Sequence, residues 1–142
     1  MIKKSIIFCI LISSVFLVQA GKRKKNTENM PLLNTKWILE EIMEIPVVHG
    51  LDTAFIVFDD HYKFSGNLGC NLFFGTFSFS KKRIKIDYLG ATKKYCADMT
   101  LEEQFVKVLR SDIAHYYVDN NKLYLLYQKK AIAKFEGYPS SK

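Results

Sequence analysis

Hydrophobic and polar residues alternate along most of this chain, which is the two-residue period of strands with one buried face. In the run 36–42, for example, Trp37 and Leu39 share one side and polar residues take the other. Short polar turns separate successive runs, so neighbouring strands are expected to be antiparallel. The pattern predicts about eight short strands, at 36–42, 54–58, 62–65, 75–79, 83–88, 114–118, 122–128 and 131–136.

The period changes to that of a helix between residues 101 and 110. The apolar residues at helical spacing are Leu101, Phe105, Val108 and Leu109. They predict an amphipathic helix over Leu101–Arg110 with one face on the core. Thr100 and Glu103 match a capping box, in which two side chains satisfy free backbone amides at a helix start. On the opposite face, the residues expected to face water are Glu102, Glu103 and Lys107.

Short strands with one helix before the last three of them predict an α+β fold. We expect an antiparallel sheet curled into a small, partly open barrel that the helix plugs. The chain has 142 residues, of which 49% are hydrophobic. This is enough for the core of one domain, and a second domain does not fit.

The first twenty residues have the pattern of a secretory signal peptide. Lys3 and Lys4 give a positive start, and a short apolar run follows before small residues up to Ala20. The run is shorter than the ~20 apolar residues that a membrane-spanning helix needs. We therefore predict export to the periplasm or the medium without a stable membrane anchor. The expected division is a signal peptide at 1–20, a basic flexible tail at 21–30 and one domain at 31–138.

The charge of the chain lies mostly outside the predicted domain. The formal net charge is +7, but from Asn29 onward 15 basic residues face 13 acidic ones, a net +2. A domain that binds nucleic acid is expected to carry a basic face on its folded part. The distribution therefore argues against nucleic acid as a partner.

Residues 66–77 form the most unusual stretch of the sequence. They hold three of the seven glycines in the chain, which permit left-handed backbone or the close approach of another segment. These glycines are Gly66, Gly69 and Gly75. Cys70 and Asn71 lie among them, so Cys70 is expected on a constrained loop between two strands. Such a position suits a fixed crosslink better than a mobile nucleophile.

Removal of the predicted signal peptide also removes Cys9 and leaves Cys70 and Cys96. In an oxidising compartment, two cysteines most simply form a disulfide. Zinc binding would need two more ligands, and His61 and His115 lack the close paired spacing of zinc sites. The pair also lacks the Cys-x-x-Cys spacing of redox-active sites. We expect a structural disulfide, and no metal or cofactor.

A Gly-Cys-Asn sequence at 69–71 is answered by a Thr-x-x-x-Cys sequence at 92–96. Together with a tryptophan on the first strand and the single helix, these motifs resemble the META domain family, which includes HslJ-like heat-shock proteins. The resemblance covers 33–136. The matching positions are Trp37, Gly66, Gly69, Cys70, Asn71, Gly75, Phe77, Thr92, Cys96, Phe105, Leu109, Leu123 and Leu125.

The resemblance implies a bacterial envelope or secreted protein that is linked with stress tolerance. It also implies a fold related to that of type III secretion pilot proteins. Many similar proteins are lipoproteins, but Gly21 stands here at the position of their acceptor cysteine. The family implies no catalytic residues, so none is assigned.

Two classes of function remain consistent with the sequence. The first is a non-enzymatic, monomeric envelope protein that binds a protein partner. The alternative is a lipocalin-like carrier of a small apolar ligand, although lipocalins place their helix after all eight barrel strands. An enzyme is disfavoured, because no set of acid, base and nucleophile converges in the sequence.

Three surface features have a structural and a functional interpretation. Lys81, Lys82 and Arg83 form a basic turn that suits phosphate or lipid headgroups, although exposed turns are commonly charged. Asp59 and Asp60 are adjacent carboxylates on a turn, usually solvated. Four tyrosines fit cross-strand packing better than a ligand groove. They are Tyr116, Tyr117, Tyr124 and Tyr127.

We predict that the mature protein starts at Gly21 outside the cytoplasm, because the small residues before that position match a signal-peptidase site. N-terminal sequencing of protein recovered from the envelope or the medium checks this start. Protein that begins at Met1 in membrane fractions would contradict it.

Overall fold

The computed structural model describes residues 29–50, 53–111 and 115–140. In these residues one helix, α1, spans Thr100–Arg110. The strands are β1 (Thr35–Ile42), β2 (Ile45–Pro46), β3 (Phe55–Phe58), β4 (Lys63–Asn67), β5 (Leu72–Ser80), β6 (Arg83–Ala91), β7 (His115–Asp119), β8 (Lys122–Tyr127) and β9 (Lys130–Pro139). Among the described residues, no helix has the length and apolar character to cross a membrane.

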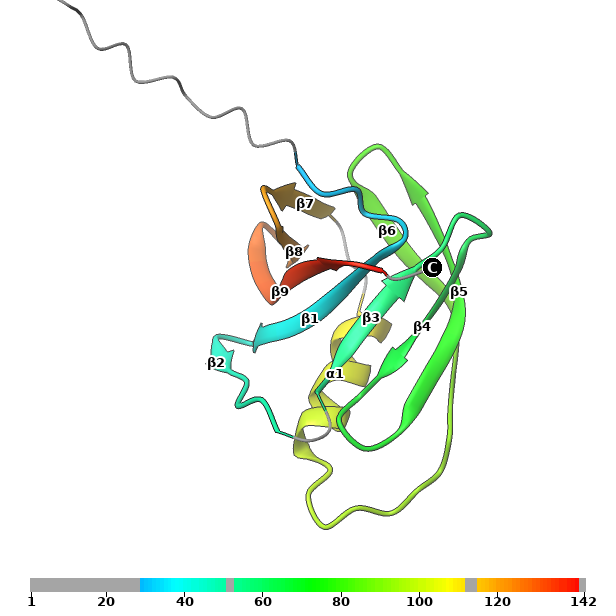
Figure 1. Cartoon of the computed structure of the whole chain (residues 1–142), viewed down its shortest axis with the longest axis vertical. Coiled ribbons are helices and arrows are strands. Elements are labelled where there is room, and N and C mark those ends of the chain that lie inside the picture. Colours follow the sequence, from blue (N-terminus) through cyan, green and yellow to red (C-terminus); the bar gives the residue numbers. More distant parts are fainter. Residues whose placement is uncertain (1–28, 51–52, 112–114, 141–142) are drawn as a thin grey trace, which may run out of the picture.

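The strands form one antiparallel sheet that curls into a half-barrel, with α1 packed into it (Figure 1). The order of neighbouring strands is β6-β5-β4-β3-β1-β9-β8-β7, and the short β2 pairs with β1. The two edges of the sheet touch where the Tyr116 amide of β7 donates to the Lys82 carbonyl at 2.7 Å. The predicted fold class is confirmed: a partly open antiparallel barrel with one helix before the last three strands.

Aromatic side chains fill the inside of the half-barrel. The largest fully buried ones are Trp37, Phe58, Phe73, Phe77, Phe105 and Phe135. Phe105 of α1 lies between the two halves of the sheet, with its ring centroid 5.6 Å from Phe73 on β5 and 5.8 Å from Phe135 on β9. Full burial of such a side chain contributes about 1.5–3 kcal/mol. The helix therefore plugs the half-barrel through an aromatic contact on both sides.

The glycine-rich stretch contains more strand than the sequence predicted. Residues 66–74, expected as a loop, include the end of β4 and the start of β5, which pair through Gly66 with Phe73 and Asn67 with Leu72. The loop shrinks to a turn at 68–71. The glycines suggested a loop, but Gly66 lies inside β4, where its lack of a side chain permits close packing. The stretch between the predicted strands 36–42 and 54–58 likewise contains β2, and Ala114, the first residue of the predicted strand 114–118, lies outside the described residues.

The helix begins differently from the predicted capping box. Thr100 is already helical, and the N-cap residue is Met99, whose side chain makes no capping hydrogen bond. The Asp98 carboxylate instead accepts a hydrogen bond from the Thr100 amide at 2.9 Å. This bond lowers the pKa of the exposed Asp98 carboxyl. The capping box was therefore wrong, because an acidic residue two positions earlier supplies the acceptor for a free amide of the first turn.

The buried face of α1 is the one that the sequence predicted. Phe105, Val108 and Leu109 are buried, and Leu101 packs partly buried against them. On the other face the prediction was wrong for Glu102. Its carboxylate faces the β4–β5 turn and accepts hydrogen bonds from Asn71.

The substitution Phe105→Ala should lower the free energy of unfolding by about 3–5 kcal/mol, because it empties a site enclosed by the sheet and the helix. Chemical denaturation of the purified protein measures the change. Glu103→Ala, on the exposed side of the same helix turn, should stay within about 0.5 kcal/mol of the parent. A loss below about 1 kcal/mol for Phe105→Ala would mean that the helix is packed differently.

Candidate functional site

The structure brings Cys70 and Cys96 to disulfide distance, with Cα atoms 6.3 Å apart. Cys70 lies in the β4–β5 turn, and Cys96 lies in the segment between β6 and α1. Both side chains are half-buried. The pair therefore connects two loops that are 26 residues apart in the sequence. Sulfur atoms joined in this way offer neither a free thiol nor a zinc ligand.

The amide side chain of Asn71 is the most connected polar group of this region. Its Oδ1 accepts from the Thr92 hydroxyl and the Lys94 amide, both at 2.7 Å. Its Nδ2 donates to the Lys94 carbonyl at 3.1 Å and to the Glu102 carboxylate at 3.0 Å. The Asn71 backbone amide also donates to Glu102, at 2.9 Å. We call these four residues, Asn71, Thr92, Lys94 and Glu102, the Asn71 network.

The Asn71 network joins the β4–β5 turn, the segment after β6 and the first turn of α1. Asn71 is only 2% exposed, so its hydrogen bonds are largely shielded from water. Among the described residues, no buried side-chain nitrogen or oxygen lacks a hydrogen-bond partner. Because every polar atom of Asn71 is used within the protein, the network is a structural device and presents no free group to a substrate.

The predicted glycines have separate roles around this network. Gly69 adopts a backbone φ of +108°, which the tight turn requires and which residues other than glycine rarely take. Gly66 and Gly75 lie under aromatic rings inside the half-barrel. A Cβ on either residue would overlap a neighbouring strand's carbonyl and the ring of Phe73 or Phe64, respectively. These two glycines make room for the aromatic core and do not position Cys70 directly.

Trp37 is fully buried on β1, which β3 separates from β4 in the sheet. Its indole nitrogen donates to the Leu32 carbonyl at 2.9 Å, which ties the segment before β1 to the core. Gly137 lies opposite it on β9 and leaves room for the indole ring. Trp37 therefore belongs to the core and not to a ligand site.

The acidic turn at Asp59 and Asp60 has a structural role. The Asp59 carboxylate accepts from the backbone amides of His61 at 2.9 Å and Lys63 at 2.8 Å, which closes the turn between β3 and β4. His61 and Asp60 form an exposed pair at 2.9 Å.

The Tyr117 and Tyr124 rings stack at 4.5 Å across β7 and β8, as expected for cross-strand packing.

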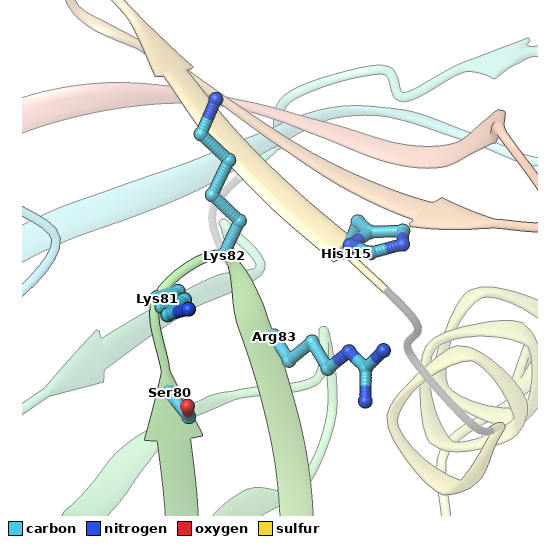
Figure 2. Close-up of a pocket in the computed structure, with 5 residues that line it drawn as sticks. All are labelled: Ser80, Lys81, Lys82, Arg83 and His115. Carbon is cyan, nitrogen blue, oxygen red and sulfur yellow. The ribbon is translucent and has the colours of Figure 1, made fainter.

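A hollow of about 560 Å³ lies where the two edges of the sheet meet (Figure 2). We call it the basic groove, and it is lined by Ser80, Lys81, Lys82, Arg83 and His115. The Tyr116 hydroxyl donates to the Lys81 carbonyl at 3.2 Å. A tyrosine phenol is protonated at neutral pH, and burial raises the pKa of Tyr116 further. The groove is the candidate binding site that the strands assemble.

The sequence did not predict two hydrogen-bonded contacts between residues that are far apart along the chain. Glu102 is 31 residues from Asn71, and Tyr116 is 35 residues from Lys81. Neither distance leaves a local pattern in the sequence. The acidic character of the first helix turn was visible, but its partner was not.

Fold and site together define a small antiparallel half-barrel in which a cysteine pair and a buried asparagine tie one helix into the sheet. The sequence model of the META domain matches residues 30–137, and the chain belongs to the META domain family. The expected family is thereby confirmed. No curated protein was found to match the chain.

Two structures solved by NMR share the fold. One is 24% identical and superposes with a TM-score of 0.61, over 74% of this chain and 90% of its own. The other, a protein from Burkholderia xenovorans, is 17% identical with a TM-score of 0.63, over 75% of this chain and 83% of its own. At these identities the likeness extends to the fold alone.

We predict that Cys70→Ser lowers the free energy of unfolding by up to about 3.5 kcal/mol, because the crosslink restricts a loop of this size in the unfolded chain. Cys96→Ser should give the same loss, and the double variant no more, since all three remove one bond. Denaturation under oxidising conditions measures these values. Intact mass after native alkylation is the independent check: two modified thiols in the unreduced protein would refute the bond.

Proposed function

We propose that this META domain protein is exported to the bacterial cell envelope, takes part in stress tolerance and acts without catalysis by binding a protein partner. The observation that carries the proposal is the cysteine pair at disulfide distance in a domain that follows a signal-like leader. Structural disulfides persist in oxidising compartments and are rare in the cytosol. The pair therefore supports a location outside the cytoplasm.

The filled interior favours binding on the outside over carriage of a ligand inside. Trp37, Phe58, Phe77, Phe105 and other rings occupy the half-barrel, and each is at most 2% exposed. A lipocalin-like carrier needs an internal cavity of its own. No observation favours that alternative.

Exposed apolar residues gather around the β1–β2 hairpin, which Figure 1 shows at the rim of the half-barrel beside α1. Ile45 is 53% exposed and Val48 is 93% exposed. Two hollows flank the hairpin. One, of about 330 Å³, lies between Met43 and Tyr127, and the other, of about 360 Å³, lies between Val48 and Leu101. Exposed apolar surface of this kind is typical of protein interaction sites, and we place the partner's contact here.

Cross-linking in intact cells, followed by purification of the tagged protein, identifies the partner. Its affinity is then measured with the purified pair. Ile45→Asp with Val48→Asp should weaken binding at least about tenfold, because two charges enter an apolar contact. Phe74→Asp with Tyr88→Asp is the matched control, since both side chains are more than half exposed and lie on β5 and β6, at least three strands from β1 in the sheet. A partner that binds all variants equally would contradict the proposed surface, and finding only cytoplasmic partners would contradict the proposed location.

A further inference from the structure

The cations of the basic groove have no carboxylate partner among the described residues. Ion pairs within those residues join other lysines to acids, such as Lys122 to Glu136 at 3.8 Å and Lys130 to Glu44 at 2.9 Å. None of them includes Lys81, Lys82 or Arg83. Asp112, the carboxylate nearest to His115 in the sequence, falls outside the described residues. Three adjacent cations thus share one turn without compensation from the part of the chain that is described.

The backbone that presents these cations is fixed. Ser80 and Arg83 pair across the β5–β6 turn, and Lys81 takes a left-handed φ of 55° between them. The carbonyls of Lys81 and Lys82 both accept hydrogen bonds from Tyr116 of β7. The turn is therefore held from two sides, by the pairing of β5 with β6 and by the hydrogen bonds from β7. Preorganisation of this kind reduces the entropy that a binding site loses when it takes a ligand.

The donors of the groove come from both edges of the sheet. In Figure 2, Arg83 of β6 and His115 of β7 lie on the same side of the turn, and Lys82 extends along β7. Arginine offers a planar fork of N–H groups that matches phosphate oxygens, and lysine adds a point charge. The imidazole of His115 and the hydroxyl of Ser80 provide further N–H and O–H donors.

We propose that the basic groove binds a phosphate group, with Arg83 and His115 on either side of it and the two lysines supplying long-range attraction. This site lies at the seam of β6 and β7 and is separate from the apolar surface at the β1–β2 hairpin. It does not rest on the proposed partner. The phosphate belongs either to a soluble phosphate ester or to an anionic lipid headgroup, and the two sources share the same recognition chemistry.

The test follows backbone amide signals of the purified protein by NMR in two arms. One arm adds glycerol 3-phosphate, and the other adds vesicles of phosphatidylglycerol in phosphatidylcholine, with phosphatidylcholine vesicles as the blank. Binding should shift or broaden the signals of residues 80–83 and 115 saturably and weaken as salt rises. Response to the ester identifies a soluble source, and response to the anionic vesicles alone identifies the headgroup.

The variant Lys82→Gln/Arg83→Gln should bind about tenfold more weakly, which corresponds to the loss of a charged hydrogen bond. Lys93→Gln/Lys129→Gln is the matched control, because it removes the same charge from exposed positions elsewhere. Both variants keep the basic tail, so a difference in affinity between them is due to the basic groove. Equal binding by the two variants, or no saturable response in either arm, would overturn the proposal.

Discussion

The buried side chain of Asn71 is the constraint on which the arrangement of this fold depends. One amide group satisfies backbone groups of the segment after β6 and, at the same time, holds the carboxylate of Glu102 on α1. A polar group at this depth is costly unless all its hydrogen bonds are made. The turn, the segment and the helix must therefore be in place together. The aromatic plug formed by Phe105 follows, because the first turn of α1 is fixed against the sheet.

The cysteine pair acts at the same junction by a different physical route. The Asn71 network stabilises the folded state directly, whereas a disulfide acts mainly by restricting the unfolded chain. Two independent devices thus hold the loops beside α1. The surfaces at the β1–β2 hairpin and in the basic groove remain exposed. This division of roles leaves both surfaces available for the binding that we propose.

The sequence predicted the strands and the helix face, which follow from the local hydrophobic period. It did not predict the contacts between residues that are far apart along the chain. The alternation around Trp37 and the helical spacing of Phe105 located the sheet and the buried helix face. The glycines were correctly singled out, but Gly66 was predicted in a loop and lies in β4, because the Phe73 ring that needs its space is brought to it only by the pairing of β4 with β5. Glu102 looked like a solvated residue for the same reason. His115 could be joined to the basic turn only when the order of the strands was known.

The most direct test of this account is a double-mutant cycle between Asn71 and Glu102. Asn71→Ala, Glu102→Ala and the double variant are unfolded with denaturant, alongside a control cycle that pairs Asn71 with the exposed Glu103. A coupling of about 1.5–3 kcal/mol is expected for Asn71 with Glu102, the range of hydrogen bonds to a charged group. The control cycle should be additive. Additivity within about 0.5 kcal/mol for Asn71 and Glu102 as well would contradict the central role of the network.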